Sequence, residues 1–370
     1  MIYLDYNATT PIHPAVREAM LPFLAERYAN PTSSHAMGRR EREAVEKARE
    51  QVATLIGASP EEVMFTSGGT ESNNHAIKGA AWTKENAGKH IILSAVEHPA
   101  TSNPCRFLER HGFEITVVPV DRHGRVDPQS IAEEIRGTTV LVSIMHANNE
   151  VGTIQPIAEI AEITREAGVW FHSDAAQSCG KIPTRVDELG VDFLSIAGHK
   201  LYAPKGVGAL YVRKGVSIEP LLHGAGHENG RRAGTEALPA IVGLGAACEL
   251  AQTDPPAAHM KSMRDRLHDR LRERLSDRAV LLGHPELRLP STLAIGFRGA
   301  FSGDVMTKCP ELAASLGAAC HKTGDRKRSA VLDAMGVPDD VAYGMIRFST
   351  GRGTKVEDVD RAAEMIVQAL

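Results

Sequence analysis

Short apolar runs alternate with helical patterns between about residues 60 and 215. The runs EVMFTS, HIILSA, EITVVPV, TVLVSIMH, VWFHSD and VDFLSIAG are rich in β-branched residues and are bounded by turn residues, which is typical of buried strands. Between two of them, PIAEIAEITREAG has Ile157, Ile160 and Ala161 on one helical face and Gly168 at its end. This alternation predicts an α/β fold with a mostly parallel sheet and helices on both faces.

The pattern changes on either side of this region. Before it, apolar residues at helical spacing predict a long helix that includes Val45 and Ile56. After it, TDPPAAH predicts a hinge, followed by a charged helix, two short strands (STLAIGF and MIRFST) and a final helix. We therefore expect a large domain over residues 16–250 and a smaller α+β domain formed by residues 1–15 and 251–370.

Composition excludes several classes of protein. The 370 residues are 42% hydrophobic and 24% charged, which is ordinary for a globular chain, and the net charge of −4 gives no reason to expect nucleic acid. No apolar run reaches the ~18 residues of a membrane span, and the N-terminus has no basic region of a signal peptide. Five cysteines without a CxxC pair, and no HxH or HExxH arrangement, argue against a disulfide framework or a metal site. We expect a cytoplasmic protein that binds neither membrane nor metal.

One segment at the end of a predicted strand is suited to a phosphate. In FTSGGTESNN the strand leads into Gly68 and Gly69, and a helix is expected to begin near Glu71. Free N–H groups and the positive end of the helix dipole favour an anion there, and Thr70 adds a hydroxyl. The segment matches neither GxxxxGK[ST] nor GxGxxG, so a capped helix with a tight turn is an equally good interpretation.

An acid and a lysine follow two other predicted strands. Asp174 in FHSDAAQS lies where open α/β sheets place their ligands, with Gln177 one helical turn further on; a helix N-cap is the alternative interpretation. Lys200 in SIAGHKLYAPKG follows a buried strand, where burial disfavours the charged amine and makes it nucleophilic, although a surface-loop lysine is the common alternative. A phosphate site, an acid and a lysine together are the three contacts that pyridoxal phosphate requires.

The chain closely resembles the cysteine desulfurase family of pyridoxal-phosphate enzymes in eight ordered segments: LDYNATT, TSGGTESNN, EHPA, NNEVGT, HSDAAQS, AGHKLYAPKG, GRRAGT and IRFSTGR. The resemblance covers essentially the whole chain. It implies the fold-type I architecture, with a mostly parallel seven-stranded sheet flanked by helices in the large domain. It also implies the conversion of L-cysteine to L-alanine, with the sulfur transferred to a protein thiolate as a persulfide.

The resemblance implies a role for each matching residue. Lys200 would hold the cofactor covalently, Asp174 would pair with its pyridinium nitrogen, and Gln177 would bond its phenolic oxygen. His98 in EHPA would stack on the ring and transfer protons. The other implied contacts are Gly69, Thr70 and His199 to the phosphate, Thr235 reaching from the partner subunit of a homodimer, Asn149 to cofactor and substrate, and Arg347 to the substrate carboxylate.

The implied sulfur acceptor is Cys320 in ELAASLGAACHKTGDRKRS, which we expect to lie on a mobile loop of about residues 309–330. Neighbouring positive charge would lower the pKa of its thiol; the candidates are His321, Lys322, Arg326, Lys327 and Arg328. A small packing cysteine is the alternative interpretation. Cys105, Cys179 and Cys248 are expected to be packing residues, and Cys309 an accessible spare thiol.

Two departures from the family pattern leave alternatives open. The GAACH sequence around Cys320 is more similar to that of selenocysteine lyases, so L-selenocysteine is an alternative substrate to L-cysteine. Ala197 stands where the family often has serine, which removes one hydroxyl contact to the phosphate. An aminotransferase of the same fold is a third possibility, which the Cys320 segment argues against. A persulfide-acceptor protein, such as an iron–sulfur scaffold or a thiolation enzyme, is the expected partner.

Overall fold

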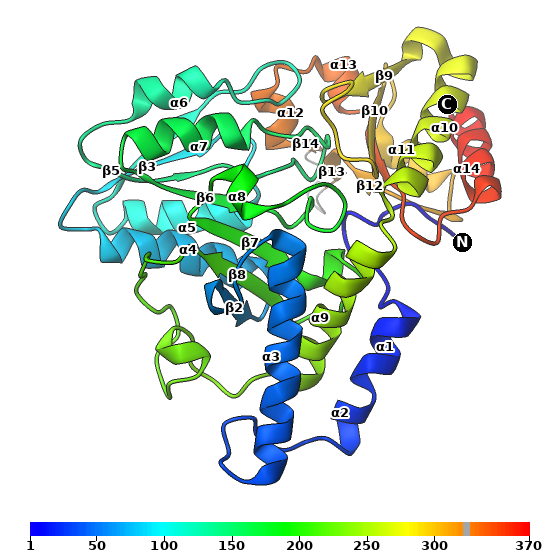
Figure 1. Ribbon diagram of the computed structural model, residues 1–370. Coiled ribbons are helices and arrows are strands. Elements are labelled where there is room, and N and C mark those ends of the chain that lie inside the picture. The colour runs from blue at the N-terminus through cyan, green and yellow to red at the C-terminus, as the bar shows by residue number, and fades with distance from the viewer. Residues whose placement is uncertain (321–325) are drawn as a thin grey trace.

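The computed structural model describes residues 1–320 and 326–370 of the chain (Figure 1). A seven-stranded sheet has the order β2-β8-β7-β6-β5-β3-β4, and β8 alone in it runs antiparallel to its neighbours. Its strands are β2 (Val63–Thr66), β3 (His90–Ser94), β4 (Glu114–Val118), β5 (Thr139–Ser143), β6 (Trp170–Asp174), β7 (Phe193–Ala197) and β8 (Gly208–Val212). The mostly parallel α/β fold that the sequence predicts is therefore confirmed.

Along each strand the side chains point alternately to the two faces of this sheet, and helices pack against both faces. Ile91 and Leu93 of β3 pack in one core with α4 (Gly69–Thr83) and α5 (Pro99–Glu109). Ile92, between them, packs in a second core on the opposite face. The helices on that side are α3 (Ala36–Ile56), α6 (Pro128–Glu134), α7 (Ile157–Glu166), α8 (Val186–Leu189) and α9 (Leu238–Thr253). The short helices α1 (Pro14–Met20) and α2 (Pro22–Ala25) lie along α9 (Figure 1).

A second sheet and its helices form a separate core. This antiparallel sheet has the order β12-β15-β10-β9, with β9 (Ala279–Leu282), β10 (Thr292–Phe297), β12 (Ser315–Leu316) and β15 (Met345–Ser349). Leu267 and Leu271 of α10 (Ala257–Leu275) and Ile366 of α14 (Val356–Ala369) are fully buried against it. The remaining helices here are α11 (Ser302–Thr307), α12 (Ala330–Ala334) and α13 (Asp339–Ala342). The division at residue 250 stays a prediction.

Cys320 ends β13 (Ala318–Cys320), which pairs antiparallel with β14 (Arg326–Arg328). The predicted charge neighbours His321 and Lys322 lie outside the described residues, and the mobility expected for residues 309–330 stays a prediction. Cys309 was expected to be accessible, and this was wrong: it is 1% exposed, and its thiol donates to the carbonyl of Met365. Its position in the core beside α14 explains the burial.

The first 13 residues join the two cores. The short strand β1 (Ile2–Tyr3) pairs with β11 (Leu312–Ala313) of the smaller core. Further on, Thr10 reaches the turn that follows β7, where its backbone N–H donates to the carbonyl of His199 at 2.9 Å. The Thr10 hydroxyl also donates to that carbonyl and accepts from the N–H of Tyr202. The N-terminal segment thereby holds both ends of the turn that carries Lys200.

No helix of the described residues combines the length and the apolar character needed to cross a membrane.

The 3₁₀ turns are Pro60–Glu62, Gly198–Lys200, Glu228–Gly230 and Ser276–Arg278. The residues after Asp174 form a hydrogen-bonded turn, with the N–H groups of Ser178 and Cys179 both donating to the carbonyl of Ala175. The helix expected between Asp174 and Gln177 is therefore a tight turn.

The hydrogen bonds between Thr10 and the turn that carries Lys200, called here the Thr10 clamp, give a stability prediction. Thr10→Val keeps the shape of a 3% exposed side chain but removes its hydroxyl, which leaves the N–H of Tyr202 without its partner. We expect a loss of about 1–3 kcal/mol in the free energy of unfolding, measured by urea denaturation. Thr10→Ser keeps the hydroxyl and serves as the control; equal stability of the two variants would show that the clamp contributes nothing.

Candidate active site

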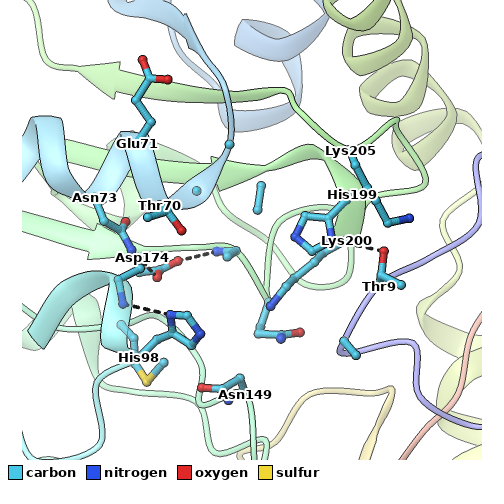
Figure 2. A pocket seen from close by; sticks show the side chains of 18 of the residues that line it. Thr9, Thr70, Glu71, Asn73, His98, Asn149, Asp174, His199, Lys200 and Lys205 are labelled. Carbon is cyan, nitrogen blue, oxygen red and sulfur yellow. Dashed lines mark hydrogen bonds between the residues drawn. The ribbon is translucent and has the colours of Figure 1, made fainter. Parts of the chain in front are cut away.

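A cavity of about 430 Å³ lies at the carboxyl ends of β6 and β7 and beside the start of α4 (Figure 2). Parallel strands present their carboxyl ends at one edge of the sheet, which is where open α/β folds bind ligands. Nearly all the predicted cofactor contacts line the cavity: Gly69, Thr70, His98, Asn149, Asp174, Gln177, His199 and Lys200. The roles of these residues stay predictions, but the fold does bring them together.

Asp174 is held rigidly at the end of β6. Its two carboxylate oxygens accept from the side-chain amide of Asn73 at 2.7 Å and from the N–H of Ala176 at 2.8 Å (Figure 2). Asn73 is fully buried on α4, so the carboxylate is oriented by a residue from another element. The sequence reasoning missed Asn73; its place in TSGGTESNN, one helical turn beyond Thr70, was the available signal.

Lys200 extends into the cavity from the turn after β7 (Figure 2). Burial lowers the pKa of its amine to about 8, and the charge of Arg347 adds to the effect, while Asp174 opposes it. About a tenth of the amine is therefore uncharged at pH 7, whereas an exposed lysine stays almost fully protonated. Such an amine is suited to attack an aldehyde and to exchange a proton.

The turn before α4 forms one end of the cavity. Gly68 has a φ of 147°, which favours glycine, and a Cβ at Gly208 of the neighbouring strand would lie 2.7 Å from the Cα of Gly68. The first turn of α4 leaves backbone N–H groups without partners inside the helix. Glu71 accepts from the N–H of Ser67 and forms an ion pair with Arg232, so the turn is fixed from both sides.

His199 and two further residues stand beside this turn. The His199 Nδ1 atom lies 3.2 Å from the hydroxyl of Thr9, and burial followed by the charges of nearby lysines lowers its pKa to about 4 (Figure 2). Thr9 and Lys205, which the sequence reasoning did not single out, both line the cavity. Ala197 lines it as well, and its methyl group lies 3.1 Å from where a Cβ of Gly69 would be. Thr9 and Lys205 therefore add polar groups to the same cavity.

His98 is the N-cap of α5. Its Nδ1 atom accepts from the N–H of Ala100 at 3.1 Å, so the neutral ring carries its proton on Nε2 (Figure 2). Burial lowers its pKa, with the charge of Lys200 adding to the effect and that of Asp174 opposing it. His98 therefore offers a proton donor, Nε2–H, at neutral pH.

Arg347 and Thr235 do not line the cavity, and nothing is described of the Cys320 side chain. The Nη atoms of Arg347 donate to the carbonyl of Asn149, to Asp5 at 2.8 Å and to Ser315 at 2.6 Å, while its buried Nε has no partner among the described residues. Thr235 is exposed in the loop before α9. Arg347 thus reaches the cavity through Asn149, and the role of Thr235 stays a prediction.

Comparisons with known proteins agree with this geometry. The class-V aminotransferase family matches residues 2–362. The chain belongs to this family. It is 48% identical over 369 residues to "Cysteine desulfurase IscS" of Dictyoglomus turgidum, covering 99% of this chain and 93% of the relative.

Solved structures resemble the whole fold. A NifS-like protein superposes with a TM-score of 0.93 at 38% identity, with 99% of this chain and 98% of the other covered. The structure described as "SspA in complex with cysteine" gives a TM-score of 0.83 at 36% identity, with 94% and 98% covered. The predicted family, fold-type I architecture, enzyme class of cysteine desulfurase and cofactor are confirmed by these comparisons. They give the selenocysteine lyase alternative no support.

The residues present fit pyridoxal phosphate. The cavity volume lies in the usual range for a cofactor of this size. Free N–H groups of α4 would suit a phosphate, the fixed carboxylate of Asp174 would suit a cationic ring nitrogen, and the buried amine of Lys200 would suit an aldehyde. Among the described residues, no group of three or more His, Cys, Asp or Glu is arranged to hold a metal ion.

The contact between Asn73 and Asp174 gives a prediction about cofactor affinity. Asn73→Ala removes a hydrogen bond to a charged group, which is worth about 1.5–3 kcal/mol, and frees the carboxylate to turn. We expect the Kd for pyridoxal phosphate, measured by fluorescence titration of the cofactor-free protein, to rise about tenfold or more. Asn74→Ala, which removes an amide that bonds only within α4, is the control. Equal affinities for the two variants would show that Asn73 does not orient Asp174 for the cofactor.

Proposed function

We propose that the chain acts on L-cysteine, releasing L-alanine and passing the sulfur to Cys320 as a persulfide. The observation that carries this proposal is the convergence of Lys200, Asp174 and the first turn of α4 on one cavity, in a chain 48% identical to a cysteine desulfurase. The structure of a related protein described as a complex with cysteine supports the substrate.

Each binding residue then has a function that its contacts support. Lys200 anchors pyridoxal phosphate covalently, Asp174 keeps the ring nitrogen protonated, and Gln177 donates to the phenolic oxygen. The bound cofactor supplies an electron sink for negative charge at the substrate Cα. Gly69, Thr70 and His199 bind the phosphate, and the ring of His98 packs against the cofactor. Thr9 and Lys205 extend the phosphate contacts.

Proton transfer is divided between two residues. The Lys200 amine, with its pKa lowered to about 8, is suited to take the proton from the substrate Cα. The Nδ1 atom of His98 is engaged by the N–H of Ala100, so its Nε2–H is suited to donate a proton rather than to take one. Asn149 and Arg347 are the proposed contacts of the substrate carboxylate: Asn149 lines the cavity, and Arg347 lies behind it, with a buried Nε that has no partner among the described residues.

Cys320 supplies the thiolate that attacks the substrate sulfur. The S–Cβ bond breaks as the S–S bond forms, the electron pair returns to carbon, and protonation there gives alanine. The segment bearing Cys320 is tied beside the cavity at both ends: Ser315 accepts from Arg347, and Ser329 donates to Glu150, the neighbour of Asn149. These two contacts support the proposal that Cys320 acts at this site.

The active protein is proposed to be a homodimer. Thr235 is exposed and lies outside its own cavity, as expected of a residue that serves the partner's site. Arg232, three residues earlier, forms an ion pair with Glu71 beside the phosphate turn, which links this loop to the site. Exposed apolar side chains at Leu24, Tyr28 and Met37 provide surface for a partner. A persulfide-acceptor protein and a cytoplasmic location complete the proposal.

The activity is tested by alanine release from L-cysteine, with L-selenocysteine measured in parallel. Wild type is expected to turn over cysteine. Lys200→Ala is expected to lose both turnover and the absorption of the lysine-bound cofactor. Cys320→Ala is expected to keep that absorption but to release alanine from cysteine at least about a hundredfold more slowly, because the sulfur has no acceptor.

Cys309→Ala is the matched control, since it removes a buried thiol outside the cavity. Wild-type rates on cysteine in the Cys320→Ala variant would rule out Cys320 as acceptor. Turnover of selenocysteine alone would overturn the choice of substrate.

The dimer gives a separate prediction. Sedimentation equilibrium should give twice the 39.9 kDa of one chain. Thr235→Ala should keep that mass but raise the Kd for pyridoxal phosphate about tenfold, because one hydrogen bond to a charged phosphate is lost. A monomeric mass for the active wild type would exclude a shared site.

A further inference from the structure

Lys181 is a buried amine beside the cavity that no step of the proposed function uses. It lies in the turn after β6, is 5% exposed, and donates to the side-chain carbonyl of Gln177 at 3.3 Å. Within residues 1–320 and 326–370 this is the one hydrogen bond of the Lys181 amine, and no carboxylate forms an ion pair with it. A buried cation without a counter-ion is costly, so its presence needs an explanation.

The charged and titratable groups that face Lys181 are Lys200, Arg347 and the thiol of Cys179. Burial, reinforced by the charges of Lys200 and Arg347, lowers the pKa of Lys181 to about 7. A void of about 10 Å³ is lined by both lysines, behind the cavity that Lys200 enters. The amines of Lys181 and Lys200 are therefore close enough to interact electrostatically.

Gln177 connects Lys181 to the cavity, and its contacts settle the orientation of its amide. Its oxygen accepts from Lys181, whose ammonium form can only donate. Its nitrogen donates to the carbonyl of Asn7 at 3.0 Å, and a carbonyl can only accept. Both partners give the same assignment, which leaves one N–H of Gln177 for the cavity that this residue lines.

We propose that Lys181 is a positioning residue that holds the oxygen of Gln177 away from the cavity, so that Gln177 presents an N–H to the phenolic oxygen of pyridoxal phosphate. This inference rests on the proposed function, in which Lys200 and Gln177 bind the cofactor. A donor at the phenolic oxygen stabilises its ionised form and weakens its hold on the proton shared with the Lys200 nitrogen. Lys181, which lies against the side-chain oxygen of Gln177, polarises this amide and makes its N–H a stronger donor.

The test is a spectrophotometric pH titration of the Lys200-bound cofactor in variants at the two positions. Lys181→Met is expected to raise the pKa of this chromophore by about one unit, a tenfold change in the protonation equilibrium. Gln177→Ala is expected to raise it by a similar amount. Because Lys181 acts through Gln177, the double variant should shift no further than Gln177→Ala alone.

Two further variants separate the positioning of Gln177 by Lys181 from a mere loss of positive charge and from a loss of folding. Lys181→Gln keeps a donor at this position and is expected to shift the chromophore less than Lys181→Met. Lys84→Met removes a partly buried lysine that lies over the ring of Trp170, outside the cavity, and is expected to leave the chromophore unchanged. Without cofactor, Lys181→Met should be at least as stable to urea as wild type, because it removes an unpaired buried cation.

Each outcome decides a specific point. An unshifted chromophore in Lys181→Met and Lys181→Gln, or additive shifts in the double variant, overturns the role of Lys181. Reduced stability of Lys181→Met together with an unshifted chromophore means that Lys181 only supports the fold. A wild-type protein that forms no lysine-bound chromophore overturns the proposed function, and this inference with it.

Discussion

The path of residues 1–13 is the constraint on which the site depends. Asp5 pairs with Arg347 from β15, Asn7 accepts from Gln177 and donates to the carbonyl of Asn149, and Thr10 closes the turn that carries Lys200. These contacts join residues separated by more than a hundred positions in sequence. Tyr202, which completes the clamped turn, has a φ of 66°, a conformation that costs energy outside glycine and persists only when its surroundings hold it.

The same neighbourhood explains the lowered pKa values of two buried lysines, Lys200 and Lys181. Lys200 and Lys181 share buried surroundings with Arg347, and their pKa values fall to about 8 and about 7. Arg347 pairs with Asp5 at 2.8 Å, whereas neither lysine has a carboxylate within ion-pair distance in the described part of the chain. Reactivity at Lys200 therefore follows from burial and from the distribution of counter-ions around it.

A second set of ion pairs fixes the loop that bears Thr235. Arg49 on α3 binds both oxygens of Glu228, which also accepts from the N–H of Phe65 on β2. Arg232 then pairs with Glu71 at the start of α4. Removing one partner of such a buried pair costs more than the pair itself contributes, so these contacts specify the position of the loop rather than add much stability. The phosphate turn and the proposed dimer loop are thereby held in one arrangement.

The sequence by itself determined the strands β2 to β7, the long helices and eight of the residues that line the cavity, because hydrophobic periodicity and the eight motifs are local properties of the chain. It did not identify β8 as a strand, the tight turn after Asp174, the burial of Cys309, or the contributions of Asn73, Thr9, Lys205 and Lys181. Each of these depends on which distant segment packs alongside. Asn73 and Lys181 have ordinary positions in a helix and a turn, and only the tertiary structure sets their side chains against Asp174 and Gln177. Hydrogen-bond partners and burial are properties of the folded arrangement, and for that reason only the tertiary structure decided them.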